Sequence, residues 1–365
     1  MTWSPQQERA IADVRTWIKD PAAPQVFRLF GYAGTGKTTL AKHLADDVKG
    51  KVLYGAFTGK ASLVLRRKGC ANASTIHSMI YSVEESEKQW EPKFRLNPLS
   101  QVRDAKLVVI DECSMVGEEI GRDLLSFGTK VLVLGDPAQL PPVKDAGFFT
   151  EHTPDVMLTE VHRQAAENPI IRMSMDVREG RRLRHGSYGS SKVIPRAEVD
   201  QSEVIAADQV LVGLNRSRIT YNDRLRDLKG LPEREPVPGD KLVCLRNNRE
   251  KKLLNGGLWQ VEEITEMKPI GVKMLVTSED SPERKATEVY VRHEFFRGTY
   301  DSLSWEQRRY SDEFTFGYAL TVHKSQGSQW DNVYLFDESG GFREHRERWL
   351  YTGLTRAAER VTVVA

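Results

Sequence analysis

The sequence has 365 residues, of which 39% are hydrophobic and 28% charged, and its formal net charge is +2. This is an ordinary globular composition, so disordered, coiled-coil and collagen-like proteins are excluded, and the length predicts more than one domain. Because positive and negative charges nearly balance, a globally basic nucleic-acid binder is also excluded, and any basic groove must be local.

The cysteines and the N-terminus limit the cellular setting. Three cysteines lie far apart, and the sequence has neither a Cys-x-x-Cys nor a His-Glu-x-x-His pattern, which argues against a disulfide framework and against protein-bound zinc. The N-terminus lacks a basic region followed by an apolar one, and no apolar stretch reaches membrane-spanning length. We therefore expect a cytoplasmic protein that is not secreted and has no membrane partner.

Between residues 25 and 136, short apolar segments alternate with amphipathic ones. The apolar segments are QVFRLFG, KVLYGAFT, KLVVIDE and KVLVLGD, and the amphipathic ones include KTTLAKHLADDV and GEEIGRDLLSFG. This alternation predicts a parallel sheet covered by helices on both faces. The charged segment 81–99 contains two prolines and keeps neither period, which indicates a hairpin excursion from the sheet.

A second alternation of helices and strands begins after residue 160. Asn168 and Pro169 predict a helix start, and Gly180 its end. Segment 186–192, GSYGSSK, is rich in Gly and Ser and predicts a loop with no chemistry. Between about 231 and 311, short strands separated by turn residues, including Asn255-Gly256, predict a small β-barrel or SH3-like insert. The α/β pattern then resumes and ends in RVTVVA.

The segment GYAGTGKT, residues 31–38, matches a phosphate-binding loop between a predicted strand and helix. Its glycines let consecutive backbone N–H groups curl around phosphates, Lys37 reaches the β and γ oxygens, and Thr38 ligates Mg²⁺. The alternative is a Gly-rich turn without function. The residues predicted here to bind ATP are Gly34, Thr35, Gly36, Lys37, Thr38 and Thr39.

Four further residues are candidates for the same site. Asp111 and Glu112 end an apolar strand, which suits an Mg²⁺ ligand and a group that orients the attacking water, unless they form a solvated acidic turn. Gln139, in GDPAQLPPV, either senses a phosphate or belongs to a proline-stiffened turn. Gln7 is either an adenine contact or the third residue of a helix whose capping box begins at Ser4.

The order of these motifs resembles that of superfamily 1 DNA helicases, specifically the RecD-like and Dda-like group that moves 5′ to 3′. The matching segments, in chain order, are WSPQQERAI, GYAGTGKT, AFTGKAS, STIHSM, VIDECSM, GDPAQLPPV, LTEVHRQ, YALTVHKSQGSQWDNV and YTGLTRA. The resemblance covers nearly the whole chain, and it favours an adenine contact at Gln7.

The resemblance implies two RecA-like P-loop domains with parallel sheets and ATP held between them. Arg163 and Arg356 match the two family arginines that reach the γ-phosphate, and a planar, always-charged guanidinium suits that task. The alternative for each is a salt-bridged surface arginine. Gln326 and Gly327 lie where the family couples the nucleotide to the DNA strand.

The resemblance also implies contacts with single-stranded DNA. Those predicted are Phe57, Thr58, Lys60, His77, Thr321, His323 and Lys324. Phe57 stands where relatives commonly have proline, and it either stacks on a base or belongs to the core. Trp90 and Phe94 either form part of a pin that splits a duplex or attach the hairpin to its domain.

These inferences define a complete hypothesis. The first RecA-like domain covers 1–78 and 100–160, with a hairpin insert at 79–99; the second covers 161–230 and 312–365, with the SH3-like insert at 231–311. We expect a monomeric, ATP- and Mg²⁺-dependent 5′ to 3′ DNA helicase acting on single strands and single-strand/duplex junctions, possible partners being replication or repair proteins. The alternatives are a DNA-stimulated ATPase that acts as a clamp or recruitment factor, and a P-loop kinase.

Overall fold

The computed structural model describes residues 3–84, 93–141, 147–160, 167–232, 234–248, 250–281 and 283–365. Residue contacts divide the chain into two compact units. Among the described residues, unit 1 contains those up to Leu183 together with Glu344–Thr355, whereas unit 2 contains Arg184–Arg343 and Arg356–Ala365. The division falls after Leu183 because α7 (Pro169–Arg178) packs against α12 (Arg346–Leu354) within unit 1. The domain limits expected from the sequence stay a prediction.

A six-stranded sheet in which all neighbouring strands are parallel forms the centre of unit 1. The strand order is β3-β2-β6-β7-β1-β8. This arrangement confirms the predicted α/β fold with a parallel sheet. The strands are β1 (Val26–Gly31), β2 (Val52–Ala56), β3 (Ser74–Thr75), β6 (Leu107–Asp111), β7 (Val131–Gly135) and β8 (Val156–Leu158).

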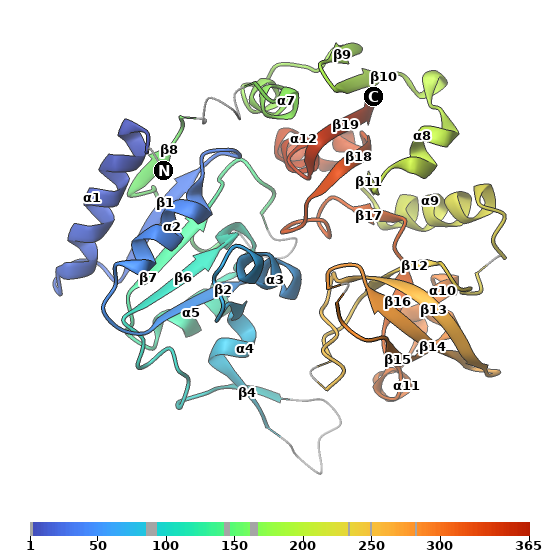
Figure 1. Ribbon diagram of the computed structural model, residues 1–365, viewed down its shortest axis with the longest axis horizontal. Helices are drawn as coiled ribbons and strands as arrows, with labels where there is room; N and C mark the ends of the chain where they lie inside the picture. Colours follow the sequence, from blue (N-terminus) through green and yellow to red (C-terminus); the bar gives the residue numbers. More distant parts are fainter. Residues whose placement is uncertain are drawn as a thin grey trace. The chain divides into compact units, whose positions relative to one another are not determined.

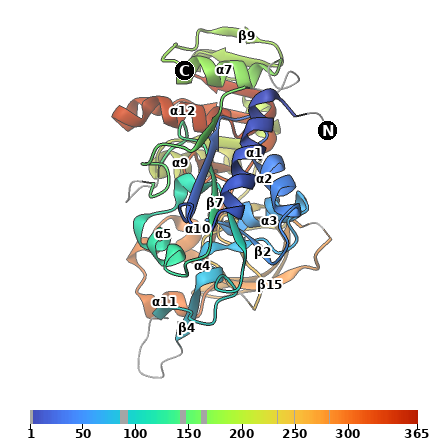
Figure 2. The ribbon, with the colours of Figure 1, turned by 90° about the vertical axis from the view of Figure 1, so that its left-hand side faces the viewer.

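Alternating side chains of this sheet enter two separate cores. Phe27 and Leu29 pack with α1 (Pro5–Lys19) and α2 (Lys37–Asp46). Val26 and Phe30 point to the opposite face, where they join residues of α4 (Ile76–Ile80) and α5 (Glu118–Leu125). Figures 1 and 2 show α1 and α2 on one side of the strands and α5 on the other. Helices therefore cover both faces, as the continuously apolar strands predict.

The remaining elements of unit 1 extend from this core. Helix α3 (Gly59–Arg67) follows β2, and the short 3-10 helix η1 (Cys113–Met115) follows β6. Strands β4 (Tyr81–Glu84) and β5 (Lys93–Leu96) pair antiparallel in the segment where the sequence predicts an excursion. Helix α7 begins as predicted, because the Asn168 Oδ1 atom accepts a hydrogen bond from the Ile170 N–H at 2.8 Å.

Unit 2 contains a second six-stranded sheet, ordered β17-β11-β18-β19-β10-β9. Its neighbours pair in parallel except β9 and β10, which are antiparallel. The bounds are β9 (Gly186–Tyr188), β10 (Ser191–Ile194), β11 (Gln209–Val212), β17 (Ala319–Thr321), β18 (Trp330–Phe336) and β19 (Ala357–Val364), accompanied by η2 (Arg196–Glu198), α8 (Gln201–Ala206), α9 (Asn215–Leu228) and η4 (Ser339–His345).

The prediction of a loop at residues 186–192 is wrong, because this segment forms the edge hairpin of β9 and β10. Tyr188 pairs with Ser191 across a two-residue turn, in which Gly189 takes a φ of +61°. Glycine tolerates this left-handed conformation, so the same composition that indicates a loop also permits a tight hairpin.

A five-stranded antiparallel sheet, ordered β15-β14-β13-β12-β16, completes unit 2. The strands are β12 (Lys241–Cys244), β13 (Leu258–Met267), β14 (Gly271–Ser278), β15 (Thr287–Arg292) and β16 (Phe314–Phe316), with α10 (His293–Arg297), η3 (Tyr300–Ser302) and α11 (Trp305–Arg309) between the last two. The sheet thus includes residues beyond 311, where the sequence places the end of the insert.

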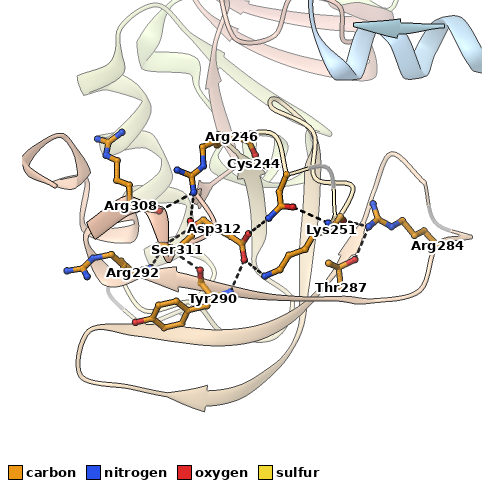
Figure 3. Close-up of polar contacts among 11 residues, drawn as sticks. Cys244, Arg246, Lys251, Arg284, Thr287, Tyr290, Arg292, Arg308, Ser311 and Asp312 are labelled. Carbon is orange, nitrogen blue, oxygen red and sulfur yellow. Dashed lines mark hydrogen bonds and ion pairs between the residues drawn. The ribbon is translucent and has the colours of Figure 1, made fainter. Parts of the chain in front are cut away.

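A buried carboxylate, that of Asp312, fastens the loop between β12 and β13 to this sheet (Figure 3). It accepts hydrogen bonds from Lys251 Nζ at 2.6 Å, from Asn248 Nδ2 at 3.2 Å and from the Tyr290 N–H at 3.1 Å. Because one carboxylate serves three donors from two segments, the loop is held in one position against the sheet.

A fully buried ion pair links α9 to the start of β12. Arg226 donates from Nε and Nη2 to the two carboxylate oxygens of Asp240, each at 2.9 Å, and the side chains are 2% and 0% exposed. Tyr318 Oη donates to the same carboxylate at 2.9 Å. The pair therefore satisfies two buried charges at the junction of the two sheets of unit 2.

Replacing Asp240 by asparagine is expected to lower the free energy of unfolding by about 3–5 kcal/mol, because it leaves the buried Arg226 charge without a counter-ion. Urea denaturation measures the change. The matched control is Glu203→Gln, which breaks the exposed pair between Lys192 and Glu203 and should cost about 1 kcal/mol or less. Equal effects of the two variants would contradict this account of Asp240.

Candidate active site

The predicted phosphate-binding loop connects β1 to α2. Gly34 and Gly36 adopt φ values of +80° and +77°, which residues with a Cβ atom rarely take. The Lys37 Nζ atom donates to the carbonyl oxygens of Gly31, at 2.5 Å, and Tyr32, at 2.9 Å, so the ammonium spans the loop. Thr35 is buried in the loop, and Thr39 is exposed in the first turn of α2. The loop therefore combines a curled backbone, a helix N-terminus and a cation.

Two oxygen ligands meet beside this loop. The Thr38 Oγ1 atom donates to Asp111 Oδ2 at 2.9 Å, joining the start of α2 to the end of β6. In octahedral Mg²⁺ coordination, neighbouring oxygen ligands also lie about 2.9 Å apart. Hydroxyl and carboxylate oxygens are hard donors that suit this ion, so these residues fit the predicted Mg²⁺ site.

Glu112 is held in an unusual backbone conformation. Its φ and ψ angles of 53° and 45° lie in the left-handed region, and its N–H donates to Asp111 Oδ1 at 2.9 Å. A non-glycine residue in this region costs roughly 1–3 kcal/mol and occurs preferentially at functional sites. The conformation turns the chain sharply at the end of β6, so Glu112 leaves the strand direction directly after Asp111.

Gln139 lies in the turn that follows β7. The turn is fixed by the Asp136 side chain, whose Oδ1 atom accepts the Ala138 N–H at 3.0 Å. The Gln139 side chain is 7% exposed, and its Oε1 atom has no hydrogen-bond partner among the residues that the structure describes. A buried amide oxygen without a donor costs free energy, which is consistent with a group that binds a ligand.

Gln7 serves the capping box and also contacts the phosphate-binding loop. Its N–H binds Ser4 Oγ and its Oε1 atom accepts the Ser4 N–H at 3.0 Å, which confirms the capping box. Its Nε2 atom also donates to the Thr35 carbonyl oxygen at 3.0 Å. The glutamine thus links α1 directly to the loop; the adenine contact stays a prediction.

The sequence analysis includes the segment YTGLTRA but assigns no role to its first two residues, Tyr351 and Thr352 of α12. The Tyr351 hydroxyl contacts Ala33 and Asp136, and the Thr352 hydroxyl contacts Leu140. These contacts join residues separated by more than 200 positions, so no local spacing could have indicated them.

In unit 1, most residues predicted to contact DNA also have local structural roles. The Phe57 ring packs partly buried against a core cluster, and Thr58 Oγ1 caps α3 by accepting the Ala61 N–H at 3.1 Å. Lys60 is only 7% exposed. The His77 and Phe94 ring centroids lie 4.3 Å apart in an edge-to-face contact, and the Phe94 side chain is 49% exposed. This contact supports attachment of the hairpin to its domain.

Two predicted residues, Trp90 and Arg163, lie outside the described residues. In unit 2, Arg356 is 5% exposed and its Nη1 atom donates to the Ser328 carbonyl oxygen at 3.1 Å, so it is not a surface arginine. Gln326 is 4% exposed, and the neighbouring Gly327 takes a φ of +74°.

The other predicted residues of unit 2 follow β17. Thr321 Oγ1 accepts the Lys324 N–H at 3.2 Å, and the His323 ring lies 5.5 Å from that of Phe342. Burial, together with the neighbouring Arg218 charge, lowers the pKa of Lys324 to about 8. The ammonium is therefore partly deprotonated in mildly alkaline solution.

In unit 1, the phosphate-binding loop, the acidic pair and the Gln139 turn follow β1, β6 and β7, which are adjacent in the sheet. Carboxyl ends of neighbouring parallel strands form the usual ligand-binding edge of an α/β sheet. This combination defines a P-loop nucleotide-binding protein.

Comparisons with known proteins extend this assignment. Residues 2–197 match the family model described as an AAA domain, and residues 316–364 match a UvrD-like helicase C-terminal domain. The chain is 28% identical over 361 residues to the ATP-dependent RecD2 DNA helicase of Deinococcus radiodurans, covering 91% of this chain and 46% of that protein. It is 22% identical to the ATP-dependent DNA helicase Pif1 of Bdellovibrio bacteriovorus, covering 91% and 81%.

The fold is similar to that of solved Pif1 helicases. The Bacteroides Pif1 helicase in complex with ADP-AlF3 and ssDNA superimposes with a TM-score of 0.58 at 18% identity, covering 100% of this chain and 93% of that one. The chain belongs to the AAA-domain family. Its matches to a UvrD-like helicase C-terminal domain and to the RecD2 and Pif1 helicases support a RecD/Pif1-like helicase of superfamily 1B. It spans less than half the length of the RecD2 relative. No helix within the described ranges is long and apolar enough to cross a membrane.

Proposed function

We propose that this chain is an ATP-dependent DNA helicase that moves 5′ to 3′ on single-stranded DNA and unwinds duplexes. The observation that carries the proposal is the contact between Thr38 and Asp111 beside a loop that presents Lys37. The order of the two matching family models, and relatives named as ATP-dependent DNA helicases, support the same function.

In this proposal the residues of unit 1 bind and hydrolyse ATP. Backbone N–H groups of Gly34, Thr35 and Gly36 and the Lys37 ammonium hold the phosphates, and Thr38 and Asp111 hold Mg²⁺, which neutralises charge on the phosphate oxygens. Glu112 orients the attacking water and accepts its proton, while the amide of Gln139 senses the γ-phosphate. Thr39 and Gln7 complete the nucleotide site.

The residues of unit 2, together with Arg163, couple hydrolysis to movement. Arg356 and Arg163 stabilise charge that develops on the γ-phosphate, and Gln326 and Gly327 connect the nucleotide to the strand. The strand itself is bound by Phe57, Thr58, Lys60, His77, Thr321, His323 and Lys324. Trp90 and Phe94 belong to the hairpin, either as part of a pin that splits a duplex or as its attachment to the domain.

The proposed domain organisation follows the sequence limits. It has two RecA-like domains, a pin at 79–99 and an SH3-like insert at 231–311; the antiparallel sheet of β12 to β16 supports the insert. We propose a monomeric protein of the cytoplasm that acts at single-strand/duplex junctions, with replication or repair proteins as partners.

The decisive experiment measures phosphate release with and without single-stranded DNA, followed by unwinding of partial duplexes. We expect DNA-stimulated release and preferential unwinding of the substrate with a 5′ overhang. A kinase would not respond to DNA, and a clamp or recruitment factor would bind DNA with little unwinding. Preferential unwinding from a 3′ overhang would contradict the proposed direction.

The charge of Lys324 predicts a pH dependence of DNA binding. Because its pKa is lowered to about 8, the ammonium is fully charged below pH 7 and loses its charge as the pH rises through 8. Nearby Cys244, with a pKa raised to about 12 by burial, stays neutral in this range. Single-strand affinity should therefore fall between pH 7 and pH 9.

Fluorescence anisotropy with a labelled oligonucleotide measures this dependence. Lys324→Gln should flatten the pH profile and reduce the slope of log affinity against log salt by about 1. Exposed Lys49, to which no role is assigned, provides the control Lys49→Gln. If Lys324→Gln keeps the wild-type profile, Lys324 does not bind a phosphate.

A further inference from the structure

One buried hydroxyl connects the phosphate-binding loop to the turn after β7. Tyr351, on α12, is 1% exposed, and its Oη atom accepts the Ala33 N–H at 2.9 Å and donates to Asp136 Oδ2 at 2.6 Å. Burial and the Asp136 carboxylate raise the pKa of Tyr351 well above its ordinary value, so the hydroxyl keeps the proton that it donates. The hydroxyl thus uses both its donor and an acceptor position.

The next residue of α12 holds the other end of the same turn. The Leu140 N–H donates to Thr352 Oγ1 at 3.0 Å, and this hydroxyl donates in turn to the Arg348 carbonyl oxygen at 2.7 Å. Asp136 and Leu140 bracket the turn, and Gln139 lies between them with a buried Oε1 atom that has no partner in the described part of the chain. Two consecutive side chains of α12 therefore fix both ends of the segment that carries Gln139.

The phosphate-binding loop is also held from a second helix. The Arg178 guanidinium of α7 lies 3.6 Å from the centre of the Tyr32 ring, a cation–π contact with the residue that precedes Ala33. The Tyr32 carbonyl oxygen in turn accepts a hydrogen bond from Lys37. Helices α7 and α12, which pack together, thus fix two consecutive residues of the loop.

We infer that Tyr351 and Thr352 are positioning residues for ATP hydrolysis. They set the Gln139 turn and the phosphate-binding loop at a fixed mutual position, and they act through these segments without contacting the nucleotide. The inference rests on the proposed function. Because the rate of a reaction between bound groups depends steeply on their alignment, a shift of about 1 Å in such a turn can lower the rate about 10²-fold.

The test uses hydroxyl deletions that preserve side-chain shape. Tyr351→Phe should lower kcat for DNA-stimulated ATP hydrolysis about 10- to 100-fold while KM for ATP changes less than about threefold. The matched control is Tyr334→Phe, because Tyr334 is also 1% exposed but its hydroxyl has no partner within the described residues. This variant should hydrolyse ATP at the wild-type rate.

Thr352 provides a second, independent variant pair. Thr352→Val removes the acceptor for the Leu140 N–H and should lower kcat, whereas Thr352→Ser keeps a hydroxyl and should retain the rate. Each rate is divided by the concentration of folded protein, which circular dichroism measures. A variant that is only less stable then shows an unchanged kcat.

Three outcomes would overturn the inference: an unchanged kcat in Tyr351→Phe, a raised KM with unchanged kcat, or equal rates for Thr352→Val and Thr352→Ser. The proposed function fails separately, if the wild-type chain releases no phosphate in the presence of DNA.

Discussion

Glu112→Gln is expected to lower DNA-stimulated ATP hydrolysis by about 10²–10⁴-fold, the usual contribution of a general base. Glutamine has nearly the same size and can occupy the same left-handed backbone position, in which Glu112 has φ and ψ of 53° and 45°. It cannot accept a proton from the attacking water. ATP and single-strand binding should therefore stay within about threefold of wild type, which filter binding and anisotropy measure, while phosphate release is lost.

Glu112→Gly separates backbone strain from chemistry at the same position. Glycine removes the roughly 1–3 kcal/mol cost of the left-handed conformation, so the folded state should be at least as stable as wild type in urea denaturation, and turnover should still be lost.

Lys37→Ala should also abolish turnover while leaving strand binding largely intact. Wild-type turnover in Glu112→Gln or in Lys37→Ala would remove that residue from the proposed catalytic set.

Local patterns were sufficient to predict most of the parallel framework. Continuously apolar segments such as KLVVIDE became buried strands, and Asn168 and Pro169 marked a helix start that the structure confirms. The hairpin at Gly186–Ile194 was missed, because composition does not distinguish a glycine-rich loop from a tight turn. The division after Leu183 was not predicted either, because it depends on the packing of α7 on α12, and these helices are far apart in the sequence.

In the candidate site, too, local motifs predict some residues, whereas others are brought together only by the fold. Lys37, Thr38 and Asp111 belong to motifs whose spacing already specifies a loop and a strand end, and the structure brings their side chains together. Gln7 showed why one pattern can support two interpretations, since a single amide caps α1 and binds the Thr35 carbonyl oxygen. Tyr351 lies in the quoted segment YTGLTRA, but no local pattern indicated its contacts, because its partners are 215 and 318 positions away.

The structure does show that Arg356 is not an ordinary surface residue. Its side chain is 5% exposed, and its Nη1 atom donates to the Ser328 carbonyl oxygen. It directly precedes β19, whose residues Val361–Val364 are buried. Its buried position at the start of a core strand is consistent with the predicted role of this arginine.

Arg356→Ala is expected to leave ATP binding within about threefold of wild type and to lower DNA-stimulated hydrolysis about 10³- to 10⁵-fold, the contribution of an arginine that contacts the γ-phosphate during transfer. Arg356→Lys should restore little of the rate, because an ammonium lacks the planar set of donors that a guanidinium offers to phosphate oxygens. Phosphate release and nucleotide binding, measured on the same preparations, separate these effects.

Arg360→Ala is the matched control. Arg360 also lies on β19, but it is exposed and pairs with Asn332. Its replacement should leave the rate unchanged. Loss of the Ser328 contact in Arg356→Ala costs about 1–3 kcal/mol of stability whether or not the arginine reaches ATP, so stability alone cannot decide its role. If Arg356→Ala is destabilised yet hydrolyses ATP at the wild-type rate, the guanidinium has a structural role within unit 2 and no role in catalysis.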